Sequence, residues 1–496
     1  MKNKFYFFNL RQGILIALIL LTVQQLAAQK NSIAINWDNT NMVSKTTPTL
    51  QVVVNPMLRD KSPMHNGAFE ALKNLGADYV RFVPWFPYPH MAVAELKAPS
   101  KNETFWDFSQ IDPIVKDFME AQKGHTVVMN FSTIPVWMFN TDEPVVYPSN
   151  RDSVFWSYNK GSEFRDTTLK ELTDYYVSLF SWYTKGGFTD ELGEFHKSGN
   201  FYKFAYWEVL NEPDLEHFKS VQQYTKVYDA IVIALKKISP ETKFIGLSLA
   251  FETNPEWFEY FLNPSNHNPE VPLEGISYHF YGTPDFPGQA LDYYQYTFFN
   301  KADAFLDRVR YIESIRKRLA PQTFTAINEI GNILGDQKGT SIPDAYWNVA
   351  GGMYAYIYLE LSKIGIDVAG ESQLVGYPTQ YPDVSMISWK TSKPNSRYWV
   401  LKLLKDNFGA GDKLVSTDLN SPQVVAQAFI TGKGKRLLLI NKRNKEARLE
   451  LPAGTKNAVM YSVDVTTKEN PPAQTQLTGN GITLKPFAVS VINFED

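Results

Sequence analysis

Two glutamates occupy positions from which acid–base and nucleophilic chemistry could be carried out. Glu212 follows the extended run Tyr206–Leu210 and precedes Pro213, and Glu329 follows the run Phe324–Asn328. Two carboxyl groups that converge on one cavity can divide the cleavage of a glycosidic bond, one as a protonated acid and the other as an ionised nucleophile or base. A single glutamate would more simply cap a helix or pair with a lysine. Two of them, each at the end of an extended run, favour the chemical interpretation.

Extended and helical patterns alternate through most of the chain. Apolar stripes at helical spacing run from Ile111 to Met119, from Val221 to Ile238 and from Phe305 to Leu319. Eight apolar or β-branched runs predict strands: Leu50–Val54, Asp78–Val83, His125–Phe131, Phe204–Leu210, Lys243–Leu249, Gly275–Phe280, Thr323–Asn328, and a last one at Ile366–Ala369 or Val384–Trp389. These units predict an α/β fold, a (β/α)8 TIM barrel, in which Glu212 follows the fourth strand and Glu329 the seventh. An open doubly wound sheet would instead require a Gly-rich phosphate loop or another switch-point signature.

The pattern changes after residue 410. Short strand candidates separated by Gly, Pro and Asn replace the alternation: Val424–Phe429, Arg436–Ile440, Ala447–Leu451, Ala458–Val463, Gly481–Leu484 and Val489–Phe494. Strands at this spacing predict a C-terminal antiparallel β-sandwich over residues 411–496, which we interpret as a packing domain rather than a sugar-binding one. The catalytic barrel is expected at residues 49–410. The N-terminal segment 29–48 could add a strand to the β domain through the run Ser32–Trp37.

The N-terminus has the features of a cleavable signal peptide. Basic residues precede the apolar run Ile14–Leu21, and small residues follow at Ala27 and Ala28, so residues 1–28 are predicted to be removed. The apolar run is too short for a membrane span, which needs about 20 apolar residues. We therefore expect a secreted or periplasmic protein with no membrane insertion after signal cleavage.

Composition narrows the classes of function. The 496 residues carry 49 Lys and Arg against 52 Asp and Glu, a net charge of −3, which offers no electrostatic footprint for nucleic acid. The lack of cysteine excludes disulfide scaffolds, thiolate metal sites, cysteine nucleophiles and a lipidated N-terminal cysteine. The seven histidines are scattered without H-E-x-x-H spacing, and no cofactor or metal is expected. The run Gly246–Ala250 mimics a nucleophile elbow, but the later histidines, His267 and His279, follow too closely for that fold.

The run Trp207–Pro213 resembles the acid/base motif of the retaining (β/α)8 glycoside hydrolases of clan A. Within the clan it is most similar to family 39, the β-xylosidase and α-L-iduronidase family. The motif of that family carries a glutamate four residues before the catalytic one, as Glu208 stands before Glu212. The resemblance implies that Glu212 is the acid/base and Glu329 the nucleophile of a double displacement.

The resemblance also implies five supporting residues. Asn211 would bind the 2-hydroxyl of the sugar, and Arg81 on the second strand would support the nucleophile, although Arg81 could instead form a structural salt bridge. His279 and Tyr281 match a His and a Tyr at the end of the sixth strand, with the tyrosine donating to the nucleophile. Trp389 would be the aromatic platform at the eighth strand.

Other residues could contact a sugar without belonging to the motif. Trp85 and His90 lie in a Pro-rich loop after the second strand, and Asn130 lies on the third; each could equally be a packed structural residue. The chain departs from the family pattern at Leu210, where Trp is usual, and at Asn328–Ile330, where Thr-Glu-Trp is usual. These departures concern the subfamily, and so the choice of sugar.

The sequence thus predicts an exported, retaining, exo-acting and β-xylosidase-like enzyme that uses an oligo- or polysaccharide. A neutral pocket lined by aromatic rings favours an uncharged sugar, whereas a uronic acid would call for a cation such as Lys338 or Arg397. Long loops at Pro135–Thr167 and Gly282–Asn300 favour a closed pocket and therefore exo-cleavage. An α-L-iduronidase-like enzyme of acidic glycans, a transglycosylase and a non-catalytic carbohydrate-binding protein are the alternatives.

Overall fold

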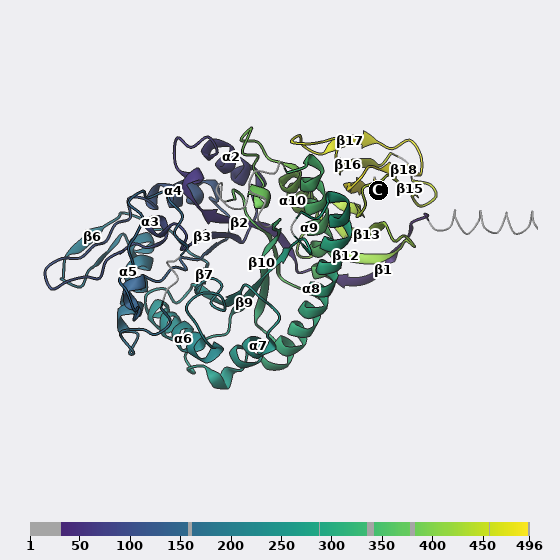
Figure 1. Cartoon of the computed structure of the whole chain (residues 1–496). Helices are drawn as coiled ribbons and strands as arrows, with labels where there is room; N and C mark the ends of the chain where they lie inside the picture. The colour runs from purple at the N-terminus through teal and green to yellow at the C-terminus, as the bar shows by residue number, and fades with distance from the viewer. Residues whose placement is uncertain are drawn as a thin grey trace, which may run out of the picture.

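Eight parallel strands close into a barrel at the centre of the structure (Figure 1). The structure is a computed structural model that describes residues 31–156, 161–286, 288–334, 342–376, 382–455 and 457–494. The barrel strands are β2 (Thr47–Val54), β3 (Val80–Pro84), β4 (Val127–Met129), β7 (Tyr206–Glu208), β8 (Lys243–Leu249), β9 (Gly275–Gly282), β10 (Phe324–Asn332) and β11 (Val368–Glu371). The last strand overlaps the alternative Ile366–Ala369, and Val384–Trp389 forms no barrel strand. The predicted signal peptide, residues 1–28, lies outside the described residues.

A helix follows each barrel strand and covers its outer face. These helices are α2 (His65–Leu75), α4 (Asp112–Ala121), α5 (Lys170–Thr184), α6 (Val221–Ile238), α7 (Pro255–Phe261), α8 (Leu291–Leu319), α9 (Asp344–Ile364) and α10 (Ser396–Asn407), with a short α3 (Pro89–Ala92) before α4. The helix α6 shows how sequence sets the bounds. The Ser220 hydroxyl accepts from the Gln223 N–H at 3.3 Å, which caps the first turn, and the helix ends at Ile238, before Ser239 and Pro240.

The C-terminal region forms two antiparallel sheets. The larger contains β12 (Lys413–Asp418), β13 (Val424–Thr431), β14 (Gly434–Asn441), β19 (Val489–Asn493), β16 (Val459–Val463) and β17 (Ala473–Gln476). The smaller contains β15 (Ala447–Glu450) and β18 (Gly481–Leu484). The N-terminal strand β1 (Ala34–Val43) pairs antiparallel with β12 and completes a seven-stranded sheet. The barrel and C-terminal β-sandwich predicted from the sequence are thereby confirmed.

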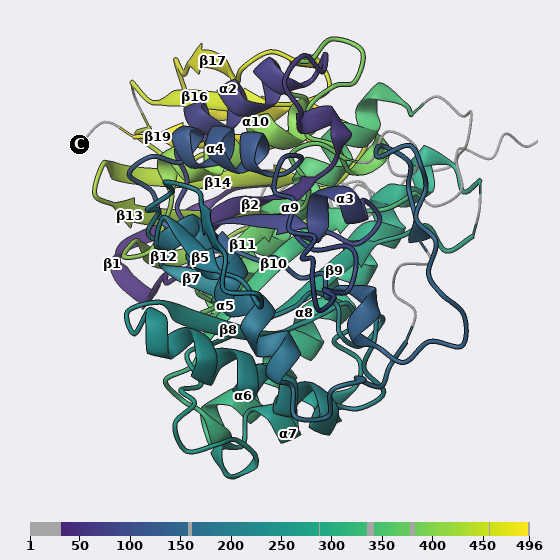
Figure 2. The same cartoon turned by 90° about the vertical axis from the view of Figure 1, so that its left-hand side faces the viewer.

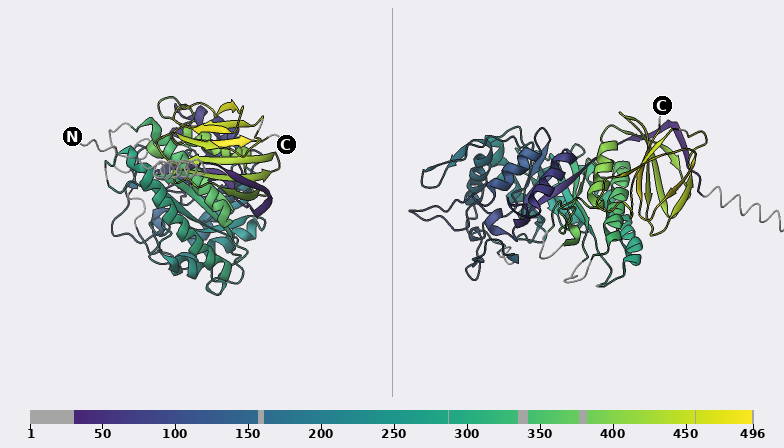
Figure 3. Two further views of the ribbon diagram at one scale, coloured as in Figure 1. Left: turned by 90° about the vertical axis from the view of Figure 1, so that its right-hand side faces the viewer. Right: turned by 90° about the horizontal axis from the view of Figure 1, so that it is seen from above.

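The larger sheet packs the smaller sheet on one face and the barrel helices on the other. Along β14, Leu437 and Leu439 join the apolar core beside β15 and β18, whereas Leu438 and Ile440 join the core that continues into the barrel. This alternation follows from the two-residue period of a strand, and it buries both faces of the sheet. Figures 2 and 3 show this sheet stacked beside α9 and α10, at one end of the molecule.

A hairpin of β5 (Gly187–Thr189) and β6 (Phe195–Lys197) extends from the opposite end of the barrel, after α5 (Figure 3). Among the helices that the structure describes, none combines the length and the apolar character that crossing a membrane requires.

Candidate active site

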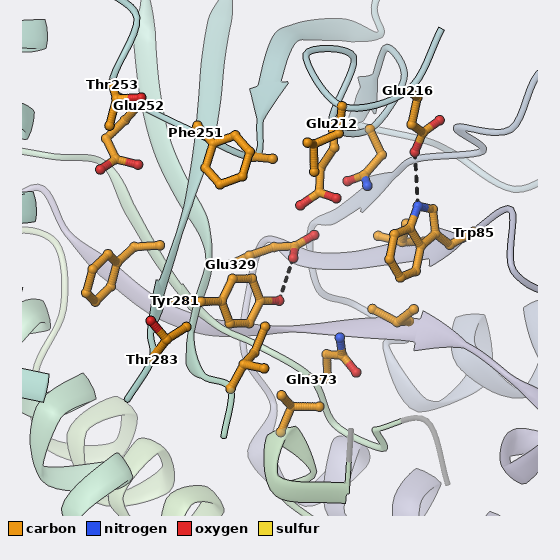
Figure 4. A pocket seen from close by; sticks show the side chains of 18 of the residues that line it. Trp85, Glu212, Glu216, Phe251, Glu252, Thr253, Tyr281, Thr283, Glu329 and Gln373 are labelled. Carbon is orange, nitrogen blue, oxygen red and sulfur yellow. Dashed lines mark hydrogen bonds between the residues drawn. The ribbon is translucent and has the colours of Figure 1, made fainter. Parts of the chain in front are cut away.

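Glu212 and Glu329 face each other at the carboxyl-terminal mouth of the barrel (Figure 4). One carboxylate oxygen of each lies within 4.8 Å of one of the other. Carboxyl groups about 5–5.5 Å apart are typical of retaining glycosidases, because inverting enzymes need about 6.5–9.5 Å to admit a water molecule. The geometry therefore fits a double displacement.

A strained turn carries Glu212. The strand β7 ends at Glu208, and two non-glycine residues in the following loop, Leu210 and Glu212, have positive φ angles of 67° and 45°. The Glu212 N–H donates to the Ser248 carbonyl on β8 at 2.9 Å, which ties the turn to the neighbouring strand. Residues held in this sparsely populated region cluster at functional sites, where the surrounding structure holds them in place.

A β-bulge aims Glu329 into the barrel. The register between β10 and β9 shifts between Ile327 and Glu329, and Glu329 lies opposite His279. In a regular strand, Asn328 and Glu329 would point to opposite faces. Because of the bulge, both side chains reach the barrel interior, where Asn328 donates to Glu208 at 2.6 Å and Glu329 accepts from Arg81.

Arg81, on β3, links the residues of the site. It is 1% exposed and donates to Glu329 at 2.6 Å and to the Asn211 side-chain oxygen at 2.6 Å. Its Nε atom donates to Glu208, and a further bond reaches Gln51 on β2 at 2.8 Å. The structure therefore combines the two interpretations of Arg81, as a support of the nucleophile and as a structural salt bridge.

Glu208 is an anchor whose role the motif alone did not show. It is fully buried, and its carboxylate accepts from Arg81, from Asn130 and, at 2.5 Å, from the Ser277 hydroxyl, in addition to Asn328. A buried charge is tolerated only when it is paired and fully hydrogen-bonded. Glu208 thus fixes Arg81, which in turn fixes Asn211 and Glu329. A charged residue within a buried strand is the sequence signal for such an anchor.

His279 and Tyr281, both on β9, complete the contacts of the two glutamates. His279 is fully buried, with Nδ1 at 2.9 Å from Glu212 and Nε2 at 3.5 Å from Glu329. The Tyr281 hydroxyl lies 2.6 Å from Glu329 and donates to it (Figure 4), and it also lies 2.5 Å from the Ser372 hydroxyl. The strand period of two places both β9 side chains on the same, inner face.

The two glutamates have opposite pKa shifts. Burial raises the pKa of Glu212, and the negative charge of Glu329 raises it further, against the hydrogen bond from His279. Burial alone would also raise the pKa of Glu329, but the positive charges of His279 and Arg81 and the hydrogen bond from Tyr281 hold that pKa below its usual value. A protonated acid beside an ionised carboxylate is the division of labour that glycoside cleavage requires.

A cavity of about 780 Å³ opens above the two glutamates. Its wall is formed by residues that lie in, or in the segments after, all eight barrel strands. Apolar and aromatic side chains dominate: Val53, Val83, Trp85, Phe86, Trp156, Leu215, Phe251, Phe280, Ile333 and Val384. The Trp85 indole N–H donates to Glu216 at 3.1 Å in the wall (Figure 4). Burial raises the pKa of Glu216 well above its usual value.

The sequence model of a protein family, glycosyl hydrolases family 39, matches residues 200–335 of the chain. This stretch contains both glutamates. The chain is a retaining glycoside hydrolase similar to family 39. Its resemblance to that family, drawn from the run Trp207–Pro213, is confirmed. A carbohydrate is therefore its substrate.

Solved structures of glycosidases resemble the whole chain. The arabinofuranosidase of family GH51 from Xanthomonas axonopodis pv. citri has a TM-score of 0.66 at 13% identity, covering 94% of this chain and 100% of its own. A glucosidase from Croceicoccus marinus has a TM-score of 0.62 at 14% identity, with coverages of 94% and 98%. A GH30 endoxylanase from Clostridium papyrosolvens C71 has a TM-score of 0.57 at 12% identity, with coverages of 93% and 99%. At such identities the likeness shows the fold alone. No curated protein sequence matches the chain.

Three predicted site residues neither line the cavity of this glycoside hydrolase nor bond to Glu212 or Glu329. Asn130 is buried beneath it and donates to the Leu210 carbonyl at 3.0 Å as well as to Glu208, so it supports the acid/base turn. His90, on α3, packs its ring against Tyr147 at 6.2 Å and does not line the cavity. Trp389 lines a different cavity, because the eighth strand is β11 and Trp389 lies 18 residues beyond its end. The aromatic platform predicted at Trp389 is therefore wrong.

Arg397, one of the two cations considered for a uronic acid, does not line the cavity. Arg397 lies on α10, is 1% exposed, and donates to the Glu371 carboxylate at 2.8 Å and to backbone carbonyls. It is a buried structural residue rather than a loop residue at the barrel mouth. Lys338 lies outside the described residues.

Among the described residues, one group of His, Asp and Glu side chains is close enough to share a metal ion. It consists of Glu212, His279 and Glu329. Each already accepts or shares a hydrogen bond within the site, and the Arg81 guanidinium on Glu329 would repel a cation. The arrangement therefore suits proton and glycosyl transfer better than metal binding.

Proposed function

We propose that the protein is an exported, exo-acting and β-xylosidase-like glycosidase in which Glu329 is the nucleophile and Glu212 the acid/base. The observation that carries the assignment of roles is the unequal surroundings of two carboxyl groups within 4.8 Å of each other. Glu329 accepts from Arg81 and Tyr281, which stabilise its anion. Among the residues that the structure describes, His279 is the one cationic side chain against Glu212, and burial favours the neutral form of this glutamate.

The proposed reaction has two steps. Glu329 attacks the anomeric carbon while Glu212 donates its proton to the glycosidic oxygen, and the bond to the leaving group breaks as the glycosyl ester forms. Esterification removes the negative charge of Glu329, so the pKa of Glu212 falls and it becomes a base. It then takes a proton from water, which attacks the anomeric carbon and releases Glu329. Asn211, held by Arg81, is placed to bond the 2-hydroxyl of the sugar.

The lining of the cavity supports a small uncharged sugar and exo-cleavage. Two cations, Lys301 and Arg308 on α8, do reach the wall. Arg308 is paired with the buried Glu252, and Lys301 lies 3.3 Å from Asp285. Because these acids compensate both cations, a neutral glycan such as a xyloside fits better than the iduronide of the alternative. The long segments after β4 and β9 contribute Trp156 and Thr283 to the wall, which favours a pocket for one chain end and therefore exo-cleavage.

A panel of nitrophenyl glycosides tests the substrate. The panel holds β-xyloside, α-L-iduronide, α-L-arabinofuranoside and β-glucoside, and proton NMR of the first product reports the anomer. We expect turnover of β-xyloside with retention. Turnover of the iduronide alone, or an inverted product, would contradict the proposal, and silence across the panel with retained binding to glycans would favour the non-catalytic binder.

Two variants test the roles. Glu329→Gln should abolish turnover of every substrate. Glu212→Ala should lower turnover of natural glycosides by about 10²–10⁴-fold but spare the first step for substrates with a good leaving group. Equal loss on activated and natural substrates would contradict the assignment of Glu212.

Expression with the natural N-terminus and mass spectrometry of the mature chain test export, with a start at Gln29 expected.

A further inference from the structure

A second cavity of about 550 Å³ lies where the barrel meets the larger C-terminal sheet. Its wall combines the first turn of α9, the segment Ile387–Ser396 at the start of α10, and the turn Lys468–Asn470 between β16 and β17. We call it the junction cavity. We propose that the junction cavity binds a segment of a carboxylated glycan chain without cleaving it.

Two tryptophans give the junction cavity its aromatic surface. Trp347 on α9 and Trp389 before α10 are both half-buried and both line the cavity. Trp347 packs edge-on against the buried Tyr346 at 5.0 Å between ring centroids, which fixes the orientation of its indole. Rigid aromatic faces bury the C–H faces of sugar rings at low entropic cost, and such rings line small-molecule sites.

The Trp389 indole has a further property of a binding position. Its Nε1 atom is buried and has no hydrogen-bond partner among the residues that the structure describes. Leaving a buried donor unsatisfied costs about 1–3 kcal/mol, so such groups in a folded protein call for an explanation. The catalytic chemistry does not explain it, because Trp389 has no place in the catalytic cavity.

Three lysines line the same cavity as the two tryptophans. Lys390, Lys393 and Lys468 line the cavity, are exposed, and have no ion-pair partner among the described residues. Two acids, Asp344 and Glu469, also line it, so the three lysines outnumber the acids by one. The excess of free ammonium groups favours carboxylate substituents on the bound chain.

The cavity is built from parts that are tied together. The Trp399 indole N–H on α10 donates to the Glu469 carbonyl at 2.9 Å, and the Ser396 hydroxyl donates to the Lys468 carbonyl at 3.1 Å. These bonds hold the turn of the C-terminal sheet against the barrel. A preformed wall of this kind lowers the entropic cost of binding.

The junction cavity is separate from the catalytic one. Val384 lines the catalytic cavity, and Ile387, three residues later, lines the junction cavity, so the same segment forms a wall of both. A chain held at the junction would raise the concentration of glycan ends near the catalytic site without touching Glu212 or Glu329. The proposal does not depend on which sugar the catalytic site prefers.

Affinity electrophoresis with the full chain tests the proposal. The Glu329→Gln variant serves as background so that no polymer is degraded, and the gels contain polygalacturonate, glucuronoxylan or neutral arabinoxylan. We expect retardation by the two acidic glycans that weakens with salt. When Trp347→Ala and Trp389→Ala are added to the Glu329→Gln variant, the apparent Kd for the acidic glycans should rise at least about tenfold. The matched control is Phe195→Ala, which removes an aromatic side chain on β6 that is 60% exposed.

A second set of variants keeps the test valid if the tryptophan changes disturb folding. Replacing Lys390, Lys393 and Lys468 with Gln removes only exposed charges, and should abolish the salt-dependent part of the retardation while Tm stays unchanged. In a chain with Glu329 intact, both sets should leave turnover of a small nitrophenyl glycoside unchanged. No retardation by the acidic glycans, equal retardation by arabinoxylan, or retardation that survives both sets would overturn the proposal. If the chain without junction substitutions fails to turn over the nitrophenyl glycoside but shows retardation that both sets remove, the result counts against the catalytic assignment alone.

Discussion

At the scale of single residues, two side chains of the same type, Glu212 and Glu329, have different pKa values because their neighbours differ. Glu329 lies beside a guanidinium and a phenol, whereas Glu212 lies against His279. These neighbours lower one pKa and leave the other raised. Activity should therefore fall at low pH as Glu329 becomes protonated and at high pH as Glu212 loses its proton, which produces a bell-shaped profile.

The Tyr281→Phe variant tests this difference between the two pKa values. Removing the hydroxyl takes away a hydrogen bond that favours the Glu329 anion, so the pKa of Glu329 should rise. The acid limb of the kcat/KM profile should then move to higher pH, and kcat should fall by roughly tenfold or more because the nucleophile is less well stabilised. The basic limb should move little. An exposed tyrosine on α8 supplies the control Tyr293→Phe, and an unshifted acid limb would contradict the role of Tyr281.

Glu216 provides a second test in the cavity wall. Burial raises the pKa of Glu216 and so favours the neutral carboxyl, and an amide has nearly the same shape and can still accept from Trp85. Glu216→Gln should therefore keep kcat/KM within about fivefold of the parent, an effect of about 1 kcal/mol. Glu216→Ala should raise KM by roughly tenfold, because Trp85 loses a partner. Steady-state kinetics at two pH values measure both, and a strong loss in the Gln variant would indicate that the charged form is required.

At the scale of elements, irregularities in the strands place the catalytic groups. The bulge in β10 turns Asn328 and Glu329 into the barrel together, and a second register shift in β8 lies beside Ser248. Ser248 accepts from Arg81 at 2.9 Å through its hydroxyl and from Glu212 through its carbonyl. The strands supply the scaffold, and the shifts aim the side chains.

Gly370 on β11 makes room for the β10 bulge. A Cβ atom at this position would lie 3.0 Å from the Cα and carbonyl oxygen of Asn328. Gly370→Ala should therefore push the bulge and move Glu329, lowering kcat by roughly tenfold or more, with a stability loss of about 1–3 kcal/mol. Gly409→Ala, where a Cβ atom meets nothing within 4 Å, is the control. Full activity in Gly370→Ala would show that the bulge tolerates displacement.

The strands and helices could be predicted from the sequence better than the directions in which their side chains point. Apolar runs and helical stripes identified seven barrel strands and left the eighth between two runs, because burial on both faces selects such runs. The strict two-residue period could not show that Asn328 and Glu329 share one face. The error at Trp389 had a related cause, since a second apolar run competed with β11 for the eighth position. The strands β12 and β17 were not predicted from the sequence: β17 is exposed along its whole length, and β12 buries only Leu414 and Val415.

At the scale of the whole molecule, the barrel and the larger sheet share one apolar core. Leu414, Phe429, Leu438 and Val491 of the sheet belong to the same buried cluster as the barrel helices. Polar bonds reinforce it, as where Arg443 donates to the Gln295 carbonyl of α8 at 2.7 Å. An interface that resembles a domain interior couples the stability of the two parts.

Unfolding should therefore occur in one transition. Phe429, on β13, is fully buried and lies 4.5 Å from the Phe408 ring at the end of α10. Phe429→Ala should cost about 3–5 kcal/mol, because it leaves a cavity between sheet and barrel. Since the core is continuous, the single calorimetric peak should shift to lower temperature as a whole, and the loss of glycosidase activity should coincide with the loss of circular dichroism. A new peak for the sheet alone, with the activity lost only at the original temperature, would show that the barrel is stable without its β domain.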